Sequence, residues 1–379
     1  MMRLIWSQLP LKSTVNAAVH ALKRSSNSLV VVGDKAYVYG GEQTPRVPVD
    51  NELWIIDLED GSVSPAPTSM LRPSARVGTC LTYKPETASL YLWGGRESKD
   101  MTPCNSDLWT YGLISGQWQK YATAAGVSDE DKVEDRSYHA MCIAAHNLYL
   151  HAGCPAQGRL ATLHSVSLSS SSLSAPVTWS PLSAGPGSGR GGTVLCPVNV
   201  PGSSQPLLVR YGGFAGHELG GTLDYFSSAH GTWGSIALPG SEGNDSGHPL
   251  PRSVHTLIPV CPPVNAPALG HGHLVAIMLF GERGPAPAHL GHMGAGQFHR
   301  DAWALMCAPS AVSVANEHGF VFAELKQEGE GEDGGVPEPR GWFAADWAQG
   351  IHGGRVVVQG GLNDENNRLG DVWLGKIEI

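Results

Sequence analysis

The sequence predicts an all-β protein, a single six-bladed β-propeller whose ring is closed by the N-terminal strand joining the last blade. Three observations predict this fold: a segment that recurs six times, an arginine before each copy, and a composition rich in turn residues. The 379 residues include 48 Gly and 27 Pro, and only 16% of them are charged. This composition suits many short strands joined by tight turns, and it disfavours helical bundles, coiled coils and disordered chains.

The recurring segment is a strand that ends in two glycines, a variable loop, a strand with an aromatic residue, and often a strand with Trp. Its clearest copy reads LYLWGG, SDLWTYGL and GQWQKY within residues 90–121. Ala152 and Phe280 replace the first glycine in two copies. The second glycines fall at 41, 95, 153, 213, 281 and 361. Each copy is therefore predicted to form one four-stranded antiparallel blade of a closed ring.

The predicted domain covers residues 1–379 and leaves no segment for a second domain. Its blades span approximately 24–66, 76–121, 136–181, 190–236, 252–325, and 340–379 together with 1–10. The last copy lacks its own Trp strand, and LIWSQL at 4–9 is similar to the Trp strands of other copies. Trp6 is therefore expected on the outer strand of the last blade. The acidic, Gly-rich segment 327–338 is expected to be a mobile surface loop.

Charge and apolar patterning disfavour several functions. The net charge is −9 and no basic block of five or more residues occurs, so nucleic-acid binding is not expected. The longest apolar run, 274–280, is far shorter than the roughly 20 residues that span a bilayer. Seven cysteines without a CxxC pair disfavour a disulfide framework or a zinc site. With no apolar leader at the N-terminus, we expect a cytoplasmic protein.

One arginine precedes the first strand of each blade, and we call these six residues the leading arginines. They are Arg24, Arg76, Arg136, Arg190, Arg252 and Arg340. Alternate turns of a four-stranded meander lie on the same face, so all six are expected around one mouth of the central channel. There they are predicted to bind a polar or anionic substrate. In the alternative interpretation, each arginine ties its own blade to backbone carbonyls or an acid.

Other candidate residues belong to the same region. His139 and His255 each follow a leading arginine by three positions, and with Glu282 they are predicted to move protons. Trp342 and Phe343 are predicted to stack on the substrate. Glu282 also begins a long, histidine-rich loop whose side chains suit a divalent metal. The alternatives are structural roles for the histidines and an ion pair between Glu282 and a leading arginine.

Two stretches are more specific than the repeat itself. PRSVHTLIPV (251–260) is followed by GER…GHMGAGQFHRDAWAL (281–305), and PEPRGWFAAD (337–346) by VVVQGGLNDENNRLGDVWL (356–374). Together with the repeat, they resemble the small stand-alone kelch proteins that include the plant nitrile-specifier proteins and their fungal biosynthetic relatives. The resemblance implies a six-bladed kelch β-propeller that acts on reactive small molecules.

The resemblance also implies a site. In the plant members, Fe(II) held by a Glu/Asp/His set redirects the breakdown of a glucosinolate aglycone, and an arginine near the mouth helps to hold the sulfated substrate. Glu282 stands at the position of the Glu and His292 at that of the His, so these two are the implied Fe(II) ligands. The fungal relatives often accompany natural-product pathways, which implies a cyclase, isomerase or lyase.

Three functional hypotheses follow. The first is a small-molecule enzyme of secondary metabolism that rearranges or cyclises a reactive intermediate without hydrolysis, as a lyase, isomerase or cyclase. No GxSxG nucleophile motif and no nucleotide-binding glycine loop occurs, which favours catalysis by positioning and acid–base chemistry. The second is a kelch scaffold or receptor that binds a protein partner through an acidic peptide. The third is an Fe(II)-dependent lyase of the nitrile-specifier type.

Overall fold

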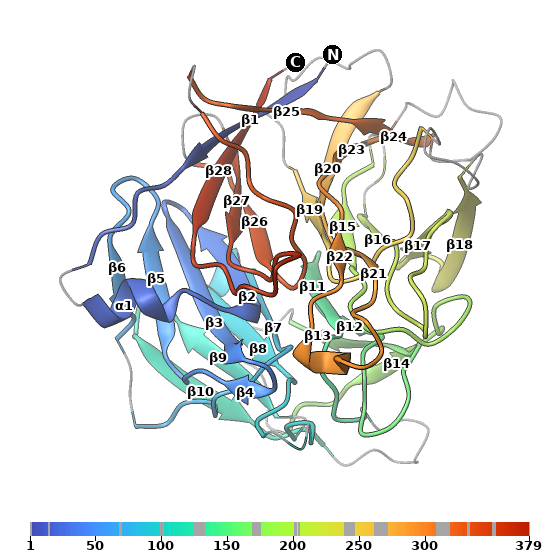
Figure 1. Cartoon of the computed structure of the whole chain (residues 1–379). Helices are drawn as coiled ribbons and strands as arrows, with labels where there is room; N and C mark the ends of the chain where they lie inside the picture. Colours follow the sequence, from blue (N-terminus) through green and yellow to red (C-terminus); the bar gives the residue numbers. More distant parts are fainter. Residues whose placement is uncertain are drawn as a thin grey trace.

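A computed structural model describes the chain apart from residues 1, 14–15, 68–69, 99, 101, 106, 125–132, 169–175, 201–202, 204, 239–246, 261–271, 308–318, 332–333, 351–353 and 379. The described residues form six sheets of four or five strands arranged in a ring, which confirms the predicted all-β, six-bladed propeller (Figure 1). The innermost strands of the six sheets converge on the centre of this ring (Figure 1).

The first three blades follow the chain from the inside of the ring to the outside. Blade one contains β2 (Ser25–Val32), β3 (Lys35–Thr44), β5 (Leu53–Asp57) and β6 (Val63–Pro65), with β4 (Val47–Pro48) beside β3. Blade two contains β7 (Cys80–Lys84), β8 (Ser89–Trp93), β9 (Leu108–Gly112) and β10 (Gln117–Tyr121). Blade three contains β11 (Ala140–Ala144), β12 (Asn147–His151), β13 (Leu163–Ser167) and β14 (Ser180–Leu182).

The last three blades have the same order, and the final blade borrows strands from elsewhere. Blade four contains β15 (Cys196–Val198), β16 (Leu207–Arg210), β17 (Thr222–Ser227) and β18 (Thr232–Ala237). Blade five contains β19 (Thr256–Pro259), β20 (His273–Leu279), β23 (Ala302–Cys307) and β24 (Phe320–Glu324). Blade six contains β26 (Ala344–Ala348), β27 (Arg355–Gln359), β28 (Val372–Glu378), β1 (Arg3–Gln8) and β25 (Lys326–Gly329).

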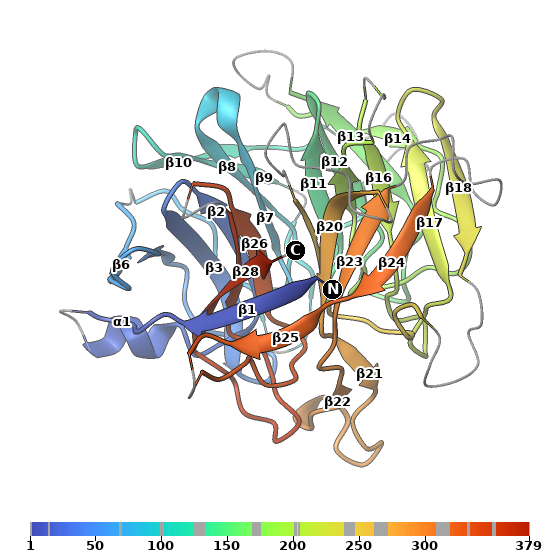
Figure 2. The ribbon, with the colours of Figure 1, turned by 90° about the horizontal axis from the view of Figure 1, so that it is seen from above.

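The remaining elements are short. They are the helix α1 (Asn16–Ala21), the 3-10 turns η1 (Pro85–Thr87) and η2 (Gly291–Met293), and a hairpin of β21 (Glu282–Gly284) and β22 (Gln297–Phe298). This hairpin projects away from the blades (Figure 2). Among the described residues, no helix has the length and apolar character needed to cross a membrane.

The N-terminal strand closes the ring as predicted. β1 pairs antiparallel with β28, with Arg3 opposite Glu378 and Trp6 opposite Gly375. Trp6 is completely buried on this strand and packs against Phe280 of the neighbouring blade. Because strands from both ends of the chain share one sheet, β1 and β28 depend on each other for their pairing.

The prediction that segment 327–338 is a mobile loop is wrong for its first residues. β25 adds a fifth strand to the last blade, parallel to β1, and Gln327 lies opposite Leu4. The Trp6 indole N–H donates to the Gln327 side-chain oxygen at 3.0 Å. The physical reason is that one edge of β1 is left without a partner by β28. A polar segment can pair with this edge through its backbone groups, whatever its side chains are.

The glycine pairs lie where neighbouring blades meet. The second glycine has φ near +100° in every blade, and its N–H donates to the carbonyl of the next blade's leading arginine at 2.8 to 3.0 Å. A Cβ on Gly95 would lie 3.0 Å from the Val77 carbonyl oxygen, so the position has no room for a side chain. Glycine is therefore required by conformation and by space.

Candidate functional site

The six leading arginines are buried inside their blades. Arg24, Arg136, Arg252 and Arg340 are fully buried, and Arg76 and Arg190 expose only 2% and 7% of their surface. In all six blades Nη1 donates to the carbonyl of the residue at the first-glycine position, at 2.7 to 3.1 Å. Asp50, Asp301 and Asp371 add ion pairs in blades one, five and six. This geometry favours the alternative in which each arginine ties its own blade, and it leaves little surface for a substrate.

The two predicted proton-transfer histidines are also buried. His139 exposes 4% of its surface and His255 exposes 6%, and neither ring nitrogen of either residue has a hydrogen-bond partner among the described residues. Burial and the nearby Arg136 lower the pKa of His139 to about 3. Burial and Arg252 hold the pKa of His255 well below its usual range. Both imidazoles are therefore neutral at pH 7.

Six residues, the second after each leading arginine, form a collar around the channel, and two of them are aromatic. The collar residues are Ser26, Gly78, Tyr138, Gly192, Val254 and Trp342. All have positive φ, between 45° and 63°. The N–H of each donates to the collar carbonyl of the preceding blade at 2.7 to 3.0 Å, so six hydrogen bonds form an unbroken ring around the channel.

The Tyr138 and Trp342 side chains meet across this collar from opposite blades. Their ring centroids are 5.3 Å apart and their planes cross at 80°. A Cβ on Gly78 would lie 2.7 Å from the Tyr138 ring, so that glycine makes room for the aromatic side chain. Trp342 is thus placed at the channel mouth, as predicted, whereas Phe343 is buried and packs edge-on against Phe280.

We call the rings of Tyr138 and Trp342 the aromatic floor. Two acidic side chains lie together on one side of it. Glu282 follows the glycine pair of blade five, is 8% exposed, and accepts a hydrogen bond from Trp342. Burial and the charge of Glu218, from the corresponding loop of blade four, raise the pKa of Glu282 to about 8. Burial raises the pKa of Glu218 to about 7, and a contact with Ser253 opposes this shift. The pair can thus hold or release a proton near neutral pH.

Arginines from other loops lie on the opposite side of the floor. Arg368 donates to Glu42 at 3.3 Å, and the Arg46 backbone N–H donates to the same carboxylate at 2.6 Å. The side-chain Nε atoms of Arg46 and Arg368 are buried without a hydrogen-bond partner among the described residues. Arg96 donates to the Ser137 hydroxyl at 2.7 Å and to the backbone carbonyls of Cys154 and Pro155 at 3.2 and 3.0 Å. We call the surface formed by these loops and the aromatic floor the mouth. Its cationic side carries Arg46, Arg96 and Arg368 together with Glu42, the partner of Arg368, and its acidic side carries Glu218 and Glu282.

The sequence interpretation missed most of the mouth. It named Glu282 and Trp342 but not Glu218, Tyr138 or the loop arginines Arg46, Arg96 and Arg368. A signal existed, since each of these residues either follows a glycine pair within one loop or follows a leading arginine by two positions. The functional prediction relied on the leading arginines because they recur in every blade. Recurrence in every blade, however, is typical of a structural role.

The implied Fe(II) ligands are only partly described. Glu282 lies at the mouth, but the side chain of His292, on η2, lies outside the described residues. Within the described part of the chain, no group of three His, Cys, Asp or Glu ligand atoms includes Glu282. The Fe(II) site therefore stays a prediction, and we assign no chemical step to it.

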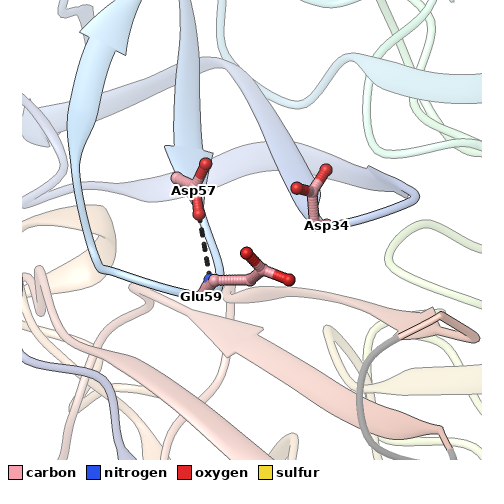
Figure 3. Close-up of side chains that lie close together, drawn as sticks. All are labelled: Asp34, Asp57 and Glu59. Carbon is pink, nitrogen blue, oxygen red and sulfur yellow. Dashed lines mark hydrogen bonds between the residues drawn. The ribbon is translucent and has the colours of Figure 1, made fainter.

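One acidic cluster does occur at the other end of blade one, formed by Asp34, Asp57 and Glu59 (Figure 3). Asp57 accepts from the Glu59 backbone N–H at 3.0 Å. The Lys35 ammonium lies 3.3 Å from Asp34 and 3.6 Å from Asp57. Asp34 and Asp57 already have Lys35 as a cationic partner, and Asp57 binds the turn backbone at Glu59, so the cluster is explained by local structure.

A sequence comparison places this architecture in a family. The family model described as the KLHDC2/KLHL20/DRC7 Kelch-repeats domain matches residues 26–261, more than half of the chain. The chain belongs to the kelch-repeat family. A protein of Thlaspi arvense named N-(sulfonatooxy)prop-2-enimidothioate sulfolyase is 31% identical to this kelch chain over 140 residues. The match covers 37% of this chain and 38% of that protein, so it spans well under two thirds of the relative's length. It supports the predicted resemblance to the nitrile-specifier type.

Proposed function

We propose that this kelch propeller is a small-molecule enzyme of the lyase, isomerase or cyclase type, and that a polar or anionic reactive intermediate binds at its mouth. One observation carries the proposal: Tyr138 and Trp342, in contact from opposite blades, lie among loops that bring the buried Arg96 and Arg368 and the acids Glu218 and Glu282 to one mouth. Such side chains, held by a rigid sheet scaffold, are typical of catalytic sites. The name of the Thlaspi arvense relative, a lyase acting on a sulfonatooxy compound, supports the same reaction class.

The cationic side would bind the anionic group of the substrate. Arg96 and Arg368 each expose 8% of their surface, and their guanidinium groups are held in place by Ser137 and Glu42. Fixed guanidinium groups stabilise an oxyanion or an anionic leaving group without reorganising during the reaction. Tyr138 and Trp342 would contact the apolar part of the same molecule and exclude water from it.

The acidic side would move the proton. With pKa values of about 8 and 7, Glu282 and Glu218 can each accept or donate a proton at neutral pH, which suits general acid–base catalysis. Removal of a substrate proton at one side of the floor and departure or migration of an anionic group at the other is an elimination or rearrangement without hydrolysis. His139 and His255 are less suited to this step, because their nitrogens are buried and their pKa values are depressed.

The test uses N-(sulfonatooxy)prop-2-enimidothioate as the probe, with products identified by mass spectrometry. We expect the wild-type protein to convert it, and Glu282→Gln to lower kcat by roughly 100-fold or more. Glu365→Gln is the matched control, because Glu365 is an exposed acid on a mouth loop and its carboxylate accepts a hydrogen bond from Asn367 of the same loop. No conversion above buffer, or an unchanged kcat for Glu282→Gln with retained circular dichroism, would contradict the proposal.

A further inference from the structure

The hairpin of β21 and β22 carries Glu282 and is anchored by a loop of the next blade. Glu282 begins β21 and lies opposite Phe298 of β22. The Phe298 N–H donates to Asp364 Oδ1 at 2.8 Å, and Asp364 lies in the loop after the glycine pair of blade six. Asn366 of the same loop donates from its side chain to the Met293 carbonyl at 2.9 Å. The hairpin, which projects from the blades in Figure 2, is therefore held at its base and near its tip.

The base of the hairpin also packs tightly against blade six. Phe298 exposes 4% of its surface, and its ring lies directly against Gly341, where a Cβ would be 2.5 Å from Phe298 Cε1. Gly341 directly precedes Trp342 of the aromatic floor. Phe298 is thus fixed through its backbone by Asp364 and through its ring by the backbone of blade six. The position of β22 is therefore tied to the floor beside which Glu282 lies.

The Gly296 backbone lies against the Glu282 carboxyl group. A Cβ on Gly296 would be 2.1 Å from Glu282 Oε1 and 2.4 Å from the Gly284 carbonyl oxygen. Gly296 is buried and its φ is not positive, so lack of space, and not conformation, excludes a side chain here. Trp342 donates a hydrogen bond to the same carboxyl group. The position of this carboxyl group therefore depends on where the hairpin lies.

We propose that Asp364 is a positioning residue for Glu282: it holds the hairpin through the Phe298 backbone, and the hairpin holds the carboxyl group at Trp342. The inference rests on the proposed function, because Glu282 is the group that would move the proton there. A displacement of a reacting group by about 1 Å can lower a rate about 100-fold. A residue that acts only through the hairpin can therefore still control kcat.

The kinetic test uses the probe N-(sulfonatooxy)prop-2-enimidothioate. Asp364→Ala removes the acceptor of the Phe298 N–H and should lower kcat roughly tenfold or more, while KM changes less than about twofold. Asp364→Asn offers the same acceptor oxygen and should keep most of kcat. Glu365→Ala, which removes the neighbouring exposed acid, should change neither constant. Combined with Glu282→Gln, Asp364→Ala should cause no further loss; losses that multiply would overturn the proposal, because Asp364 would then act independently of Glu282.

A second readout needs no turnover, so failure of the proposed function and failure of this inference can be told apart. The Trp342 indole N–H reports its bond to Glu282 in 15N NMR spectra, where Trp342→Phe assigns its signal. We expect this signal to move in Asp364→Ala and in Gly296→Ala, which places a methyl group against the carboxyl oxygen. It should stay in place in Asp364→Asn and in Gly284→Ala, where a Cβ meets no atom within 4 Å. If the wild type does not convert the probe, the proposed function is wrong, whereas an unchanged Trp342 signal in Asp364→Ala overturns the positioning role.

Discussion

At the scale of single residues, the leading arginine of each blade shows how a conspicuous charged residue can serve the scaffold. Its guanidinium group reaches the carbonyl at the first-glycine position, where the strand ends with positive φ and the backbone oxygen turns inward. A buried carbonyl without a donor is costly, and arginine can satisfy several acceptors from one planar group. The residue type and its recurrence could be predicted from the sequence, but its partners depend on this backbone geometry.

We predict that Arg252→Met destabilises the protein strongly. Arg252 is fully buried and binds both carboxylate oxygens of Asp301 at 2.7 Å, so its loss leaves a largely buried carboxylate without its partner. Removing one member of such a pair typically costs about 3–5 kcal/mol. The free energy of unfolding in urea measures this, and Arg252→Met/Asp301→Asn should recover part of the loss. An unchanged unfolding midpoint together with weaker substrate binding would instead support the substrate-binding hypothesis.

The mouth residues show what could not be predicted from the sequence. Glu218 and Glu282 are separated by 64 positions of sequence in different blades, and only the ring brings their carboxyl groups together. The repeat spacing could place both loops on one face, and it did so correctly for Glu282 and Trp342. It could not show which side chains are buried there, because burial depends on contacts between loops of neighbouring blades.

At the scale of elements, the strands were more predictable than the segments that join them. The glycine pairs and Trp strands fixed six sheets and the placement of β1, since each motif marks a strand end or an inter-blade contact. β25 carries no such motif: its residues Lys326–Gly329 read KQEG, and it pairs because the outer edge of β1 is free. Pairing of this kind depends on backbone groups alone, and so it leaves no hydrophobic pattern in the sequence.

The seam between the first and last blades yields a pH-dependent prediction. Asp346, on β26, accepts from the Val31 N–H of β2 at 2.7 Å, and burial raises its pKa to about 6. A carboxyl group with a raised pKa contributes its full stability below pH 4 and loses it as pH rises through about 6. Asp346→Asn keeps an acceptor oxygen without the charge. We therefore expect the wild type to lose roughly 2–3 kcal/mol relative to this variant between pH 4 and pH 7.

The measurement is the free energy of unfolding of both proteins at several pH values. Asp34→Asn is a suitable control, because Asp34 lies in the turn after β2 in blade one, where its side chain is exposed beside Lys35. Parallel pH profiles for the wild type and Asp346→Asn, with the difference constant across this range, would show that the Asp346 carboxyl group is not desolvated at the seam.

At the scale of the whole molecule, two closures define the propeller. The collar closes the ring near the axis through six backbone hydrogen bonds, and β1 closes it at the outside by joining β28. The collar also carries Tyr138 and Trp342, so the proposed site at the mouth depends on the same ring. Loss of either closure should therefore affect all blades and this site together, because a closed ring has no free sheet edge from which one blade could unfold alone.

We predict that deleting residues 1–10 destabilises the whole ring. The deletion removes the completely buried Leu4 and Trp6 and exposes the edges of β28 and β25. Burial of these side chains is worth about 1.5–3 kcal/mol each, so the melting temperature should fall by roughly 4–8 °C. Hydrogen exchange should show lower protection in the inner strands of all six blades.

Arg3→Ala, which removes only surface ion pairs with Glu328 and Glu378, should change the melting temperature little. Lower protection confined to blade six would show that the blades unfold independently and that the ring is not one cooperative unit.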